Sequence, residues 1–149
     1  MASRDHDHST TAKPRLTTAE ILTKAADLIE PKGAWTQGTF WRDREGRQVC
    51  LEDALLGSAS CMCMAGAIYV ASGQRHPSHR LWELVDKVIP RPRDGSAAMP
   101  FFNDNPERKQ AEVVAALRKA AALAREAEEP TDGAMKRQDG MADDGPGTN

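Results

Sequence analysis

Residues 62–71 read Met-Cys-Met-Ala-Gly-Ala-Ile-Tyr-Val-Ala, and the predicted fold is built around them. It carries no charge and is apolar on every side of a helical wheel, which predicts a helix that is buried all round. At about 1.5 Å per residue it spans roughly 15 Å, too short to cross a membrane. We therefore expect a central core helix over residues 61–72, with Ser60 as its N-cap and Gly73 just after its end. Gly66 costs about 1 kcal/mol relative to alanine inside a helix, so another backbone is expected to pack closely there.

Further helices are predicted on both sides of this core segment. Thr17 and Glu20 form a capping-box pattern, and the apolar spacing after them predicts a first helix that ends at Pro31. Another helix is expected over residues 78–89, and the last is expected to begin with Asn105 as its N-cap. The predicted core face of the last helix comprises Val113, Leu117, Ala120 and Ala124.

The remaining segments predict strands and a long loop. Aromatic and β-branched residues at 34–41 and 48–51 flank a charged turn, which is typical of a short β-hairpin. Residues 90–104 hold several prolines and form a long connection. The predicted class is α+β and mostly helical, with about four helices around the central buried helix and one short β-hairpin.

Composition predicts a single ordinary domain. The chain has 149 residues, of which 40% are hydrophobic and 28% charged. Residues 1–14 and 129–149 have too little apolar surface to offset the entropy of ordering, so we expect disordered tails around a domain over 15–128. The C-terminal tail is acidic, and residues 15–125 carry a charge of only +3. Neither nucleic acid nor a membrane is an expected partner. Three cysteines do not make a disulfide framework, which favours a cytoplasmic protein.

Cys63 is the first candidate for chemistry. A thiol near a helix N-terminus is activated by the helix dipole, with His79 as a candidate base and Asn103 or Asp104 as a candidate orienting group. The alternative is that Cys63 is a small buried apolar residue whose pKa is raised by desolvation.

A metal site is the second candidate. Cys61 and Cys63, followed by His76 and His79, have the ligand order of a zinc finger, but both gaps are shorter than that pattern requires. The alternative is structural cysteines with surface histidines. We expect no metal and no cofactor.

The third candidate is a contact site for a ligand or partner. Phe102, Asn103 and Asp104 precede the last helix, where Asx side chains either brace a loop or contact a ligand. Trp35 and Gln37 are candidates for the same contact. The aromatic residues Trp35, Phe40 and Trp41 could instead form a lid over the core.

Taken in order, four motifs resemble a family of small proteins of unknown function from actinobacteria, other bacteria and phages. These are Trp35-Thr36-Gln37-Gly38, Cys63-Met64-Ala65-Gly66-Ala67-Ile68, Phe102-Asn103-Asp104, and Val113-Val114-Ala115-Ala116-Leu117 with Ala120. The resemblance covers about residues 16–125. It implies no established reaction, but it does imply a phage or mobile-element setting.

The leading prediction is a small soluble binding or interaction protein with an unidentified protein or small-molecule partner. The alternative is a thiol-dependent enzyme that uses Cys63 with a histidine base. A zinc-supported structural module is the third hypothesis. The sequence leaves the oligomeric state open.

Overall fold

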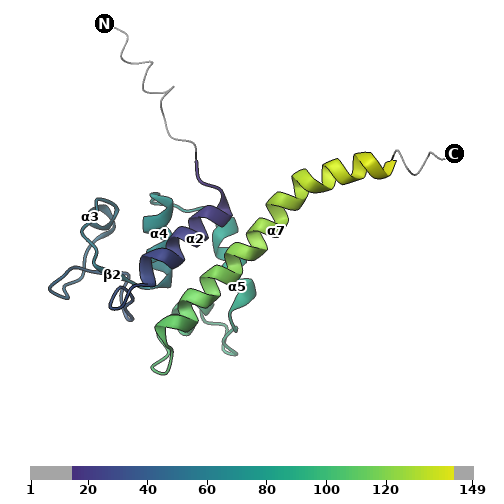
Figure 1. Cartoon of the computed structure of the whole chain (residues 1–149). Helices are drawn as coiled ribbons and strands as arrows, with labels where there is room; N and C mark the ends of the chain where they lie inside the picture. Colours follow the sequence, from purple (N-terminus) through teal and green to yellow (C-terminus); the bar gives the residue numbers. More distant parts are fainter. Residues whose placement is uncertain (1–14, 143–149) are drawn as a thin grey trace, which may run out of the picture.

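The computed structural model describes residues 15–142, with side chains as far as Glu128. Within these residues the chain forms six helices and a two-stranded antiparallel sheet (Figure 1). The helices are α2 (Thr18–Ile29), α3 (Leu51–Leu55), α4 (Met64–Ser72), α5 (His79–Val88), α6 (Ala98–Asn103) and α7 (Gln110–Ala142), and the strands are β1 (Trp41–Arg42) and β2 (Cys61–Met62). The mostly helical α+β class is confirmed. No described helix is both long and apolar enough to span a membrane.

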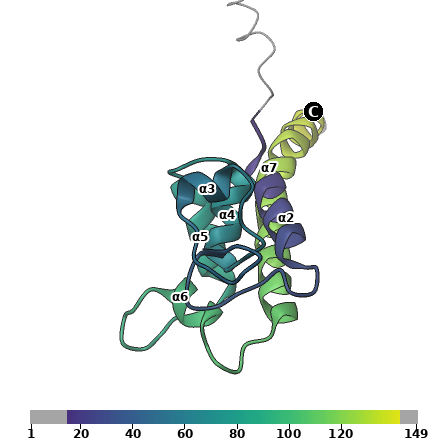
Figure 2. The same ribbon diagram turned by 90° about the vertical axis from the view of Figure 1, so that its left-hand side faces the viewer.

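The helices are arranged in two layers. Figure 2 shows α2 beside α7 in one layer and α3, α4, α5 and α6 in the other. α2 and α7 run antiparallel. The start of α7 lies at the end of α2, where Nε2 of Gln110 donates to the carbonyl of Ile29 (2.6 Å). Further along α7, Arg125 donates to the hydroxyl of Thr23 (3.2 Å). Buried alanines allow the two helices to approach closely: Ala25 and Ala26 of α2, and Ala116, Ala120, Ala121 and Ala124 of α7.

α2 and α5 lie where the sequence predicted helices. Thr17 caps α2 by accepting from the backbone N–H of Glu20 (3.1 Å), and the Glu20 carboxylate accepts from the Thr17 N–H (2.8 Å). This is the predicted capping box. α5 is capped by Ser78, and its buried face comprises Leu81, Leu84 and Val85.

α4 is central, but it begins three residues later than predicted. Its N-cap is Cys63 rather than Ser60, because residues 61 and 62 form β2. The start of the helix and its cap were therefore predicted wrongly, whereas Gly73 does end it in the left-handed region at φ 70°. Burial is also incomplete: Met64, Ala67 and Ile68 are fully buried, but Ala65, Tyr69 and Val70 are only half-buried.

The sheet differs from the predicted hairpin. The chain does turn back after β1, where Val49 donates to the carbonyl of Trp41 (3.1 Å), but only one bridge, Arg42 with Gln48, joins the two arms. The partner of β1 is β2, with Trp41 opposite Met62. Leu51, the last residue of the second predicted strand, begins helix α3 instead. The other edge of β2 forms a parallel bridge with Trp35, so β2 lies between β1 and the Trp35 segment.

The long connection after α5 contains a helix, α6, that the sequence analysis missed. α7 begins at Gln110, so the prediction of Asn105 as its N-cap is wrong. Asn105 instead caps a separate turn by accepting from the Glu107 N–H (2.9 Å). The predicted core face of α7 is confirmed: Val113, Leu117, Ala120 and Ala124 are fully buried.

α7 continues to Ala142, beyond residue 128 where the sequence predicted the domain to end. Residues 1–14 and 143–149, which fall in the predicted disordered tails, lie outside the described residues. The disorder of residues 1–14 and 143–149 stays a prediction, whereas residues 129–142, which were also predicted to be disordered, belong to α7.

Candidate functional site

Asn103, the last residue of α6, is the one fully buried polar side chain in the described part of the chain, with 2% of its surface exposed. Its Oδ1 accepts from Nε1 of Trp35 (2.8 Å) and from the backbone N–H of Met64 (3.0 Å). Its Nδ2 donates to the carbonyl of Thr36 (3.2 Å) and to Oδ1 of Asp104 (2.8 Å). Oδ1 therefore accepts two hydrogen bonds and Nδ2 donates two, so the amide is fully satisfied, as its burial requires.

Gln37 and Gly38 fasten the same two segments together. Nε2 of Gln37 donates to the carbonyls of Asn103 (2.9 Å) and Asn105 (2.8 Å). The Gly38 N–H donates to Oδ1 of Asp104 (3.0 Å). The Trp-x-Gln-Gly and Asn-Asp motifs, more than 60 residues apart in sequence, thus form one network of hydrogen bonds with the start of α4. We call this the Asn103 network: Trp35, Thr36, Gln37, Gly38, Met64, Asn103, Asp104 and Asn105.

Gly66 brings a third motif into contact with the same region. A Cβ atom on Gly66 would lie 2.4 Å from the carbonyl oxygen of Phe40, so only glycine fits at this crossing. The glycine carbonyl accepts from Nε1 of Trp41 (3.0 Å). The predicted close backbone approach at Gly66 is confirmed. It fixes the segment 38–41 against the first turns of α4.

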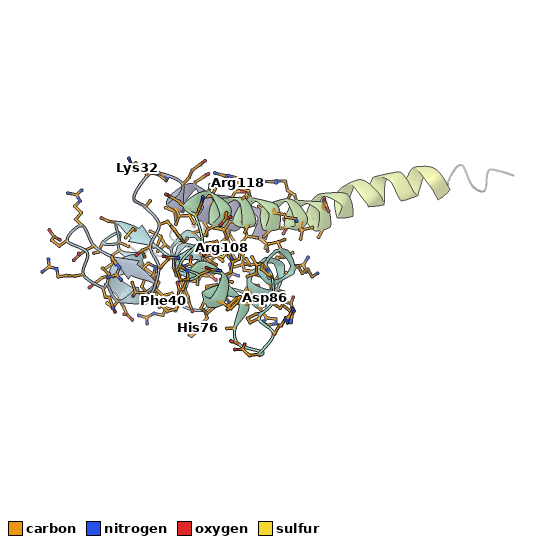
Figure 3. The ribbon with its side chains drawn as sticks, turned by 90° about the horizontal axis from the view of Figure 1, so that it is seen from below. Lys32, Phe40, His76, Asp86, Arg108 and Arg118 are labelled. Carbon is orange, nitrogen blue, oxygen red and sulfur yellow. The ribbon has the colours of Figure 1, made fainter. Side chains whose placement is uncertain are left out.

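Beside the Asn103 network lies a pocket of about 200 Å³. Three segments distant in sequence line it: Gly38, Thr39 and Phe40; Cys63 and Ala65; and Met99, Pro100, Asn103 and Asp104. Its walls are mainly apolar, and Asp104 is the only Asp, Glu, Lys, Arg or His among the lining residues. Phe40 lies at the rim with 46% of its surface exposed, on the side of the molecule opposite Arg118 of α7 (Figure 3).

A second, shallower hollow adjoins the pocket. It is lined by Pro100, Phe101, Asp104, Asn105 and Pro106. Pro100 and Asp104 belong to both hollows, so the two form one continuous surface. Phe101 is half exposed on it. We call the two hollows together the Phe40–Phe101 surface.

Cys63 faces the pocket as a neutral thiol. Its Sγ accepts from the Gly66 N–H (3.3 Å), and only 8% of the residue is exposed. Burial raises the pKa of the Cys63 thiol to about 11; the N–H groups of Gly66 and Ala65 oppose this increase, and the negative charge of Asp104 adds to it. The thiol is therefore protonated at pH 7.

The structure brings only some of the thiol-enzyme candidates together. Cys63, Asn103 and Asp104 share the pocket, but His79 does not line it. Cys63 caps the N-terminal end of α4, whereas His79 begins the helix that follows its C-terminal end and pairs with Glu83 (3.2 Å). A nine-residue helix, roughly 14 Å long, separates the two ends.

The metal candidates are also spread out. Cys61 is half-buried in β2, Cys63 is at the pocket, and His76 and His79 are exposed beyond the other end of α4. No group of three or more His, Cys, Asp or Glu side chains able to hold a metal ion occurs in the described part of the chain.

Of the predicted contact residues, Trp35, Gln37 and Asn103 direct their polar atoms to partners within the chain. Phe102 is buried and lies beneath the guanidinium of Arg108, 3.7 Å from the ring centroid. Asp104 is the predicted residue that also lines the pocket and is exposed.

Sequence reasoning missed Met99 and Pro100 as lining residues because it missed α6. It also missed Ala65 of α4, because an alanine carries no chemical signal of a site. The apolar run from residue 97 to 102, with Met99 and Phe102 three residues apart, is the signal that predicts a short helix there.

Comparison with models of protein families identifies the family of this chain. The model of a family of unknown function matches residues 13–123, which include every residue of the Asn103 network and of the pocket. The chain belongs to the DUF6197 family. The resemblance seen in the four sequence motifs is thereby confirmed. Comparison with curated proteins and with solved structures gives no match.

Proposed function

We propose that this DUF6197 protein is a small binding protein whose binding site is the pocket beside Asn103. The observation that carries the proposal is that the Asn103 network holds three distant segments around an apolar pocket that is open to solvent. Binding sites are typically largely preformed, mainly apolar hollows with a few fixed polar groups. The exposed ring of Phe40 at the rim adds apolar area for a partner.

The chemistry of the lining residues favours binding over thiol catalysis. A nucleophilic cysteine needs a lowered pKa or an adjacent base. Burial has the opposite effect on Cys63, and the pocket lining contains no imidazole. We therefore assign Cys63 a packing and capping role. A cytoplasmic, phage-related or mobile-element setting stays a prediction from the sequence.

A test uses a single-ring apolar fragment, p-cresol, titrated into the ¹⁵N-labelled full chain. We expect concentration-dependent shifts of the amide resonances of Gly38 and Ala65, which lie at the pocket. The Ala65→Leu variant fills the pocket and should weaken this binding at least tenfold.

The matched control is Ala59→Leu, which enlarges a half-buried alanine that does not line the pocket and should leave binding unchanged. Equal affinity of the wild type and Ala65→Leu, or shifts confined to other regions, would refute the proposed site. Circular dichroism checks that both variants remain folded.

A further inference from the structure

The charge of Asp104 restricts what the pocket can hold; this inference rests on the proposed function. Oδ1 of Asp104 is fixed by the N–H of Gly38 (3.0 Å) and Nδ2 of Asn103 (2.8 Å). No Lys, Arg or His in the described part of the chain lies within ion-pairing distance of this carboxylate. Arg108, which is near in sequence, instead donates to the carbonyl of Phe102 (2.8 Å) and pairs with Glu112. Asp104 is therefore a positioned, exposed carboxylate without a cationic partner in the described chain.

The other lining groups are neutral and mostly apolar. The amide of Asn103 has used all its hydrogen-bonding groups, and Cys63 is protonated. Phe40, Ala65, Met99 and Pro100 supply the walls. A complementary occupant has an apolar stem and a cationic end that reaches Asp104. An anionic occupant would face uncompensated repulsion at the same point.

The dimensions fit one side chain together with the residues that flank it. The pocket of about 200 Å³ is below the range of about 300–1,000 Å³ for sites that enclose drug-sized ligands, and the adjoining open hollow adds about 380 Å³. The surface does continue past Asp104 to the half-exposed Phe101, which leaves room for the residues next to an inserted side chain. These dimensions fit one residue of a protein partner, flanked by apolar neighbours.

We propose that the pocket holds an arginine side chain of a protein partner, with its methylene groups against Ala65 and Met99 and its guanidinium at Asp104. Arginine suits the site better than lysine because its planar guanidinium both pairs with a carboxylate and stacks on an aromatic ring. Phe40 at the rim provides that ring. The same stacking already occurs within this chain, where Arg108 lies over Phe102.

The test compares two model compounds on the full chain by NMR titration. N-acetyl-arginine N-methylamide carries the cation, and N-acetyl-citrulline N-methylamide is its neutral near-isostere. We expect both to shift the amide resonances of Gly38 and Ala65, with arginine binding about fivefold more tightly or better. In the Asp104→Asn variant, which retains the Oδ1 acceptor, the two affinities should become equal. The control Glu107→Gln removes a nearby exposed carboxylate outside the pocket and should preserve the preference.

Two results would overturn the inference. One is equal binding of arginine and citrulline to the wild type, a comparison that does not depend on any variant folding. The other is an arginine preference that persists in Asp104→Asn. If p-cresol binds at the pocket and neither amino-acid compound does, the arginine assignment fails while the proposed binding site stands. If p-cresol does not bind there either, the proposed function itself fails.

Discussion

Asn103 connects the motifs that define this chain. A buried amide with four partners stabilises the protein only while all four bonds are made, since a buried unsatisfied polar group costs about 1–3 kcal/mol. Its partners are contributed by residues 35–36, the start of α4 and Asp104. The Asn103 side chain therefore holds these segments together beside the pocket.

Replacing the Asn103 side chain should strongly lower the free energy of unfolding. Asn103→Ala leaves Nε1 of Trp35 and the Met64 N–H without their acceptor, so we expect a loss of about 2–4 kcal/mol in the free energy of unfolding. Urea titration measures it. The control is Asn105→Ala, which loses only the bond from the Glu107 N–H and should cost less than about 1 kcal/mol. Similar losses in the two variants would contradict the bracing role.

The Cys63 thiol should make the free energy of unfolding depend on pH in the alkaline range. Its pKa is raised from 9.0 to about 11 in the folded state. Between these values the folded chain keeps a proton that the unfolded chain has lost, so stability is fully present below pH 9 and falls as the pH rises to 11. The contribution is on the order of 2–3 kcal/mol.

Urea titrations at pH 8 and pH 11 measure this dependence. The Cys63→Ala variant accounts for the other groups that titrate in the same range, so the wild type should lose more stability than the variant. Equal losses would show that the thiol is not held neutral by burial.

At the scale of elements, α4 is positioned by a backbone crossing. Gly→Ala inside a helix is ordinarily favourable by about 1 kcal/mol. At Gly66 the sign should reverse, because the new methyl group would meet the carbonyl of Phe40 at 2.4 Å and Nε1 of Trp41 at 2.9 Å. We expect Gly66→Ala to destabilise by about 1–3 kcal/mol.

Thermal or urea unfolding measures the Gly66→Ala effect. Ser72→Ala at the other end of α4 is the control and should change stability by less than about 1 kcal/mol, because Ser72 bonds only locally to Tyr69 and Gln74. A stabilised Gly66→Ala variant would disprove the close crossing.

Helices whose cap or apolar stripe lies within the helix's own segment of sequence could be predicted. The capping box at Thr17 and the apolar stripe of α5 each act within one helix, and the structure has both helices where these signals place them. The start of α4 could not be predicted in this way. Residues 61 and 62 are as apolar as the helix that follows, and only their pairing with β1 and with Trp35 makes them a strand.

Short elements also depend on contacts with residues that are distant in the sequence. α6 is six residues long, too short to be stable alone, and is held through Asn103 by contacts with residues more than 35 positions away. Asn105 has the side chain of an N-cap, but it caps a turn that precedes α7. A capping residue can thus be recognised in a sequence while the element that it caps depends on the rest of the fold.

At the scale of the whole molecule, the pocket lies where three segments from different parts of the chain meet. The candidate residues Asn103, Asp104 and Cys63 were recognised from the sequence by their chemistry. Their convergence on one pocket, and the distance of His79 from it, follow only from the packing of α4 against α6 and the 38–41 segment. In the α2–α7 layer, α2 packs against α4 and α7 packs against α5 (Figures 1 and 2). The residues that line the Phe40–Phe101 surface belong to other segments of the described chain.

The proposed binding of a partner in this pocket can be tested with the small aromatic probe p-cresol. Intermolecular nuclear Overhauser effects between bound p-cresol and methyl-labelled full chain test it most directly. If p-cresol binds in the pocket, we expect Overhauser effects between its ring protons and the methyl groups of Ala65 and Met99, which line the pocket. Effects confined to Leu16 and Ile21, which line a different hollow beside α2, would contradict it.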